Sequence, residues 1–137
     1  MAVSTKVPGL IPVEQREIAL LLEAGYLYME MQKLKEADEV FQGVAALVPH
    51  SEVPLLCLGH LAFSQGWHER ALKFHREALE RAPESAWAEA QIGEALLFLK
   101  KRDEAKVSLG KAISMDPQSD AASFAQSLLD ALAAGVL

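Results

Sequence analysis

Residues 52–85 read EVPLLCLGHLAFSQGWHERALKFHREALERAPES, and this stretch decides the fold because its pattern occurs three times in the chain. Shifting the sequence so that Gly59 falls on Gly25 or on Gly93 brings an alanine and a proline into phase as well. The recurring residues are Gly25, Gly59 and Gly93; Ala37, Ala71 and Ala105; and Pro49, Pro83 and Pro117. Three residue types that share one period and one phase indicate an internal repeat.

Each recurring residue has a mechanical role in a pair of antiparallel helices. Glycine and alanine fit where two helices cross closely, because a larger side chain there would force the helices apart. Proline cannot continue a helix, so it ends the second helix of each pair. A serine follows two residues after each proline (Ser51, Ser85 and Ser119), and serine is a good N-cap for the next helix. The pattern therefore predicts three consecutive helix pairs.

The length of this repeat resembles that of the tetratricopeptide repeat, or TPR, a helix pair of about 34 residues. The resemblance places the repeats at 18–51, 52–85 and 86–119, with glycine at position 8, alanine at position 20 and proline at position 32. It implies an all-α fold in which three tandem TPR helix-turn-helix repeats and a C-terminal capping helix form a short α-solenoid. His75 and Glu89 are polar residues at positions that are apolar in the other repeats.

The two ends of the chain lie outside the repeats, and we treat residues 1–137 as a single domain. Residues 1–12 carry two prolines and a glycine and no periodicity, so we expect a flexible leader and a first helix that begins near Val13. A last helix is predicted at about 119–134, where it would cover the open end of the stack. Its apolar stripe consists of Ala121, Phe124, Ala125, Leu128 and Leu132.

The resemblance also implies where a ligand binds. In a TPR array the first helix of each repeat lines a concave groove, to which positions 2, 5, 9, 12 and 13 contribute. Most of these positions are apolar or aromatic here, and we expect their side chains to be exposed and additional to the core. An exposed apolar surface marks an interaction site, and aromatic anchors dominate binding energy. The predicted partner-binding residues are Leu22, Tyr26, Met29, Leu56, His60, Phe63, Trp87, Leu97 and Phe98.

The chemical character of this groove limits the ligand. TPR domains that bind the acidic C-terminal tails of molecular chaperones use a clamp of Lys, Arg and Asn at groove positions. The corresponding residues here are Leu22, Tyr26 and Cys57, so the clamp is absent. We therefore expect a protein or peptide client that presents an apolar or amphipathic segment.

Composition argues against other classes of function. The net charge is −6, and the densest basic run, Lys100-Lys101-Arg102, is too small a patch to bind nucleic acid. The sequence has no apolar run long enough to span a membrane and no signal peptide, so we expect a cytoplasmic protein. Cys57 is the only cysteine, which excludes an internal disulfide.

Catalytic and metal-binding motifs are incomplete in this chain. His68-Glu69 lacks the second histidine of a zinc protease, and Cys57 with His60 supplies only two ligands. The sequence contains no glycine-rich phosphate loop and no nucleophile elbow. We expect no enzymatic activity, no metal and no cofactor.

Within the TPR family, the chain resembles the small chaperones of bacterial type III secretion. The similarity lies in Val40-Phe41-Gln42 followed by Leu47, and in Leu58-Gly59. It implies a protein that holds a secreted translocator or needle subunit in its groove until export. Translocator chaperones carry an extra helix before the first repeat, and the leader here is too short for one. The alternative is a TPR scaffold subunit of a multiprotein assembly, with no release step.

Self-association is expected for either function. The apolar groove and the C-terminal Val136-Leu137 leave more hydrophobic surface than a monomer normally exposes. A symmetric homodimer is the commonest way to cover such a surface.

Overall fold

The computed structural model describes residues 4–5 and 13–137, with side chains from Glu14 onward. The described residues form seven helices and one pair of very short strands. The helices are α1 (Gln15–Glu30), α2 (Leu34–Leu47), α3 (Val53–Ser64), α4 (His68–Arg81), α5 (Ala86–Phe98), α6 (Arg102–Met115) and α7 (Asp120–Ala133). The strands β1 (Ser4–Thr5) and β2 (Val13–Glu14) are antiparallel.

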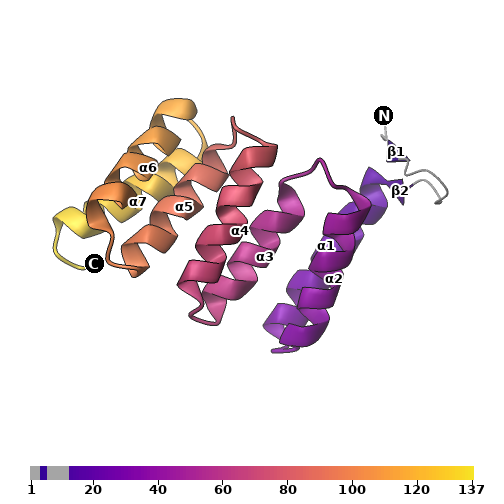
Figure 1. Ribbon diagram of the computed structural model, residues 1–137. Helices are drawn as coiled ribbons and strands as arrows, with labels where there is room; N and C mark the ends of the chain where they lie inside the picture. The colour runs from indigo at the N-terminus through magenta and orange to yellow at the C-terminus, as the bar shows by residue number, and fades with distance from the viewer. Residues whose placement is uncertain (1–3, 6–12) are drawn as a thin grey trace.

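The helices form an elongated array with α1 and α2 at one end and α6 and α7 at the other (Figure 1). Helices α1 and α2, α3 and α4, and α5 and α6 pack as pairs, and α2·α3, α4·α5 and α6·α7 join successive pairs. Helix α7 also packs against α5, so it covers the C-terminal end of the array. The predicted solenoid of three repeats and a capping helix is confirmed.

The helix boundaries follow from the residues that the repeat analysis singled out. Each second helix ends two residues before its proline, at Leu47, Arg81 and Met115. The side chains of Ser85 and Ser119 accept hydrogen bonds from the N–H groups of Ala88 and Ala122, at 3.1 and 3.0 Å, and cap α5 and α7.

The N-cap of α3 is Glu52, not the predicted Ser51. The Ser51 hydroxyl accepts a bond from the N–H of Val53 at 3.2 Å, two residues away. Pro54 lies in the first turn of α3 and has no N–H to offer, so a serine three residues before it has no donor to accept from.

The N-terminal segment departs in part from the predicted leader. Ser4 and Thr5 pair with Glu14 and Val13, whereas we expected residues 1–12 to lack structure. The rest of that predicted leader, residues 1–3 and 6–12, lies outside the described residues. Helix α1 begins at Gln15, close to the predicted start near Val13.

The close helix crossings occur where the glycines recur. A Cβ atom at Gly25, Gly59 or Gly93 would come within 3 Å of the side chain at position 24 of the same repeat, which is Phe41, His75 or Leu109 respectively. These three side chains are almost fully buried, as are the recurring alanines. Glycine at position 8 therefore lets the two helices of a repeat meet over one large residue.

The turns inside the three repeats share a backbone conformation. Gln32, Gly66 and Lys100 occupy the same position in successive repeats, and all three have positive φ angles, of 61°, 81° and 65°. Only the second repeat has a glycine there, the residue that adopts this conformation without strain. The other two turns hold a side chain in the left-handed region.

Candidate functional site

The predicted groove residues lie on α1, α3 and α5, and the structure leaves most of them accessible. Their degree of burial divides them into three groups. Tyr26, His60, Trp87 and Phe98 are exposed; Leu22, Met29, Leu56 and Phe63 are half-buried; and Leu97 is buried.

Aromatic rings connect the neighbouring first helices of the array. The rings of Tyr26 on α1 and His60 on α3 have centroids 5.8 Å apart. Phe63 on α3 and Phe98 on α5 meet edge to face at 5.0 Å. Such pairs are favourable arrangements for aromatic rings. They join α1, α3 and α5 into one partly exposed aromatic surface, which we call the groove.

A third ring pair extends the groove onto α7. Trp87 on α5 lies 5.6 Å from Phe124 on α7. Sequence analysis placed Phe124 in the stripe of the capping helix and did not assign it to the groove. Continuing the repeat numbering beyond the third repeat puts it at position 5 of a fourth unit, the position of Leu22 and Leu56, and this signal would have found it.

The groove is hollow at its N-terminal end. A cavity of about 560 Å³ lies between the first half of α1 and the start of α3, and its apolar lining includes Ala19, Leu22 and Val53. All three occupy groove positions of the repeat. The cavity is large enough to accept several apolar side chains of a partner.

Desolvation shifts the titration of several polar groups in and beneath the groove toward their neutral forms. Burial raises the pKa of the Tyr26 hydroxyl and of the Cys57 thiol, and partial burial lowers the pKa of His60. Burial also raises the pKa of Glu94 on α5. Desolvation is the largest cause in each case, because it penalises the charged form. The groove therefore favours an uncharged ligand segment.

The predicted exposure of Leu97 is wrong. It was expected to be exposed in the groove, but it is only 6% exposed and belongs to the core formed by α4, α5, α6 and α7. Ala90, at another groove position of the same helix, is also buried there. The reason is the packing of α7 against α5, which places both side chains under the capping helix.

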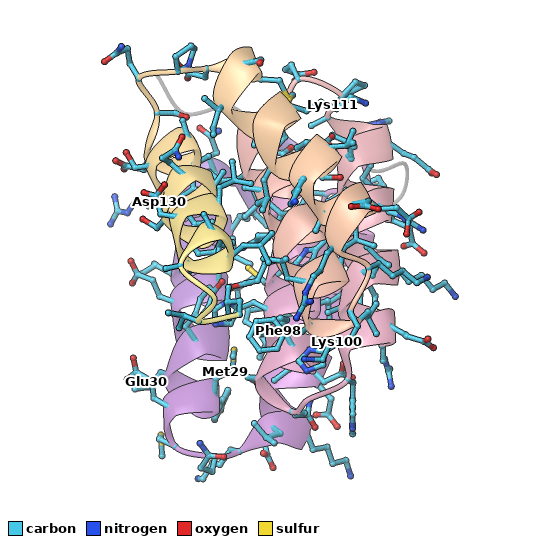
Figure 2. The ribbon with its side chains drawn as sticks, turned by 90° about the vertical axis from the view of Figure 1, so that its left-hand side faces the viewer. Met29, Glu30, Phe98, Lys100, Lys111 and Asp130 are labelled. Carbon is cyan, nitrogen blue, oxygen red and sulfur yellow. The ribbon has the colours of Figure 1, made fainter. Side chains whose placement is uncertain are left out.

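Figure 2 looks along the array from its C-terminal end and shows how individual side chains are directed. Met29 and Phe98 point inward among the helices, whereas Glu30 and Asp130 point away from the array (Figure 2). Met29 packs against the core cluster of the first two repeats. Phe98 packs against both Phe63 and His68. Met29 and Phe98 were predicted to bind a partner, and these contacts show that they also support the fold.

The prediction for the two C-terminal residues is confirmed for one of them and wrong for the other. Val136 and Leu137 were both expected to lack a burial site. Val136 is exposed, but Leu137 packs against the core cluster of the third repeat.

A tryptophan outside the groove was also missed. Trp67 is the N-cap of α4, where it makes no capping hydrogen bond, and half of its surface is exposed. The Arg70 guanidinium lies over its ring at 5.4 Å. Trp67 also lines a cavity of about 310 Å³ among α2, α3 and α4. The pattern of the repeat gives no signal for this residue, because the other repeats have Lys33 and Lys101 there.

No helix in the part of the chain that the structure describes is both long and apolar enough to cross a membrane.

Comparisons with known proteins agree with this architecture. Sequence profiles described as tetratricopeptide repeat match residues 62–128 and 19–51. The human tetratricopeptide repeat protein 7A is 35% identical over 92 residues, which are 67% of this chain and 11% of that protein. The chain thus spans about a ninth of the length of this relative.

Solved structures of low sequence identity share the fold. PcrH from Pseudomonas aeruginosa, in complex with the chaperone binding region of PopD, has a TM-score of 0.75 at 20% identity, over 96% of this chain and all of that one. The first TPR of Spaghetti (RPAP3), bound to the HSP90 peptide SRMEEVD, has a TM-score of 0.71 at 21% identity. That match covers 88% of this chain and 97% of the other.

Proposed function

Because the chain belongs to the tetratricopeptide repeat family, we propose that it binds an apolar or amphipathic segment of a partner protein in its groove and has no catalytic role. The observation that carries this proposal is the series of three ring pairs from α1 to α7, Tyr26–His60, Phe63–Phe98 and Trp87–Phe124. Aromatic side chains that are partly exposed and already held in place can bind at a low cost in conformational entropy.

We further propose that the partner is a secreted subunit and that the protein is a cytoplasmic chaperone of the type III secretion kind. The likeness to PcrH, solved with a segment of PopD, supports this proposal through the fold. The mainly apolar and aromatic lining of the groove supports it through chemistry, because an aggregation-prone segment is apolar. An acidic peptide like that bound to RPAP3 fits less well, since Leu22, Tyr26 and Cys57 replace the charged clamp.

Site-specific cross-linking in the native host tests this function. A photo-reactive phenylalanine analogue at Trp87 is expected to cross-link one client protein, and the same analogue at Trp67 is the matched control. Recovery of the same protein from both positions, or of none from Trp87, would contradict the groove. A complex that holds two different proteins at once would favour the scaffold function over the chaperone.

Truncation of the exposed groove tryptophan gives the quantitative prediction. Trp87→Ala should weaken binding of the cross-linked client segment about thirtyfold, because removing a buried interface aromatic commonly costs about 2 kcal/mol or more. The measurement is calorimetric titration of the purified protein with the synthetic segment. Trp67→Ala removes an equally large exposed ring elsewhere and should leave the affinity unchanged. An equal loss in both variants would contradict the proposed site.

A further inference from the structure

Helix α1 carries an apolar stripe that faces away from the groove. Leu20, Leu27 and Met31 are 58%, 56% and 52% exposed, and Ala24 completes the stripe. The spacing of these four residues is four, three and four, which is the spacing of a seam between two packed helices. None of the four is charged. Such a continuous row, which runs along the helix and ends at its C-cap Met31, is unusual for a surface that faces water.

The other repeats show what the stripe is built to contact. At the repeat position of Leu20 the later repeats have Pro54 and Ala88, and at the position of Leu27 they have Leu61 and Ala95. All four of these are buried.

The buried counterparts pack on the second helix of the preceding repeat. In α3, Leu61 belongs to one core cluster with Ala37 and Phe41 of α2. In α5, Ala95 shares a cluster with Leu72 of α4. The main contacts of α1 are with α2, α3 and β2, so no helix of the described chain covers its stripe.

We propose that this stripe binds the stripe of a second copy of the chain, with the two α1 helices antiparallel across a two-fold axis. An axis through the middle of the stripe places the small Ala24 opposite Leu27 and places Leu20 opposite Met31. The face is therefore complementary to itself, as a two-fold interface requires. This homodimer differs from the one expected from sequence, which would have used the groove and the C-terminal residues.

The size of the contact sets its strength. Helix α1 has 16 residues and is about 24 Å long, so two such helices bury an area at the low end of specific interfaces. We therefore expect a weak dimer that dissociates reversibly. The groove stays free in this dimer, because Leu22 lines the cavity shared with α3 and Tyr26 contacts His60, on the other side of α1.

Sedimentation velocity over a range of protein concentrations, without any client, tests the interface. The natural chain is expected to show a monomer–dimer equilibrium, and Leu27→Glu is expected to weaken it at least tenfold. Val107→Glu is the matched control, because Val107 on α6 is 62% exposed and lies away from the stripe. Circular dichroism should show the same helix content in all three proteins.

A covalent probe gives a second readout of the same contact. Leu27→Cys should form a disulfide-linked dimer on mild oxidation, whereas Val107→Cys should not. A natural chain that stays monomeric at high concentration would overturn the proposal, as would equal effects at Leu27 and Val107. Client binding by Leu27→Glu should be unchanged, so a failure of the groove function and a failure of the dimer are told apart.

Discussion

Replacing Gly59 by leucine is expected to lower the free energy of unfolding by about 3 kcal/mol, the upper part of the range for overpacked cores. A Cβ atom at this position would lie 2.8 Å from Nε2 of His75 and closer still to Cε1 and Nδ1 of that ring. His75 is only 2% exposed and has no room to move aside. Urea unfolding followed by circular dichroism measures the loss.

Gly43→Leu is the matched control for this variant. Gly43 also lies inside a helix, but a Cβ atom there meets nothing within 4 Å, and the residue is exposed. Leucine has the higher helix propensity, so this variant should be as stable as the natural chain or more so. If Gly59→Leu were no less stable than Gly43→Leu, the crossing at position 8 would not limit side-chain size.

Lowering the pH from 7 to 4 is expected to remove about 3 kcal/mol of stability through His75. Burial, with a smaller contribution from His60, lowers the pKa of His75 from 6.5 to about 4. Between these values the unfolded chain binds a proton that the folded chain does not, so stability falls as the pH falls through this window. Denaturant titrations at several pH values measure the slope.

His75→Phe separates this contribution from those of other groups. Phenylalanine occupies the same position in the first repeat, as Phe41, so the substitution is compatible with the fold. It also removes Nδ1 of His75, a buried nitrogen without a hydrogen-bond partner. The variant should lose most of the pH dependence. What remains should come from His60, whose lowered pKa acts in the same direction, and Glu94, whose raised pKa acts in the opposite one. An unchanged slope would contradict the assignment to His75.

The repeat period predicted most of the fold because it reports the local needs of each helix pair. Glycine at a crossing, proline after a helix and serine before one are demands of the backbone, and they recur wherever the backbone recurs. The caps at Ser85 and Ser119 and the extent of α7 were predicted for this reason. The pairing of Ser4–Thr5 with β2 was not, because two residues are too short to show any periodicity.

The groove was predicted less well because burial depends on neighbours that the repeat pattern does not describe. Leu97 and Phe63 share a repeat position, yet Leu97 is buried in a core that includes residues of α7, whereas Phe63 is half-buried. Leu20 and Leu27 are exposed because no described helix packs on that side of α1, whereas their counterparts in α3 and α5 are buried by the second helix of the preceding repeat. The repeat pattern predicts the same burial for equivalent residues of every unit. The units at the two ends of the array differ from the others because each lacks a neighbour on one side.

The difference between the ends has a consequence for local unfolding. Helix α1 buries only Gly25, whereas α5 buries eight residues between neighbours on both sides. In an array whose stability is a sum of nearest-neighbour terms, the terminal unit with one neighbour opens at the lowest free energy, and its amides exchange first with solvent. Opening of α1 also removes Leu22 and Tyr26 from the groove, so a bound segment could leave without global unfolding. Pairing of α1 with a second copy raises the free energy of that opening, which slows entry and exit of the segment alike and leaves its equilibrium affinity unchanged.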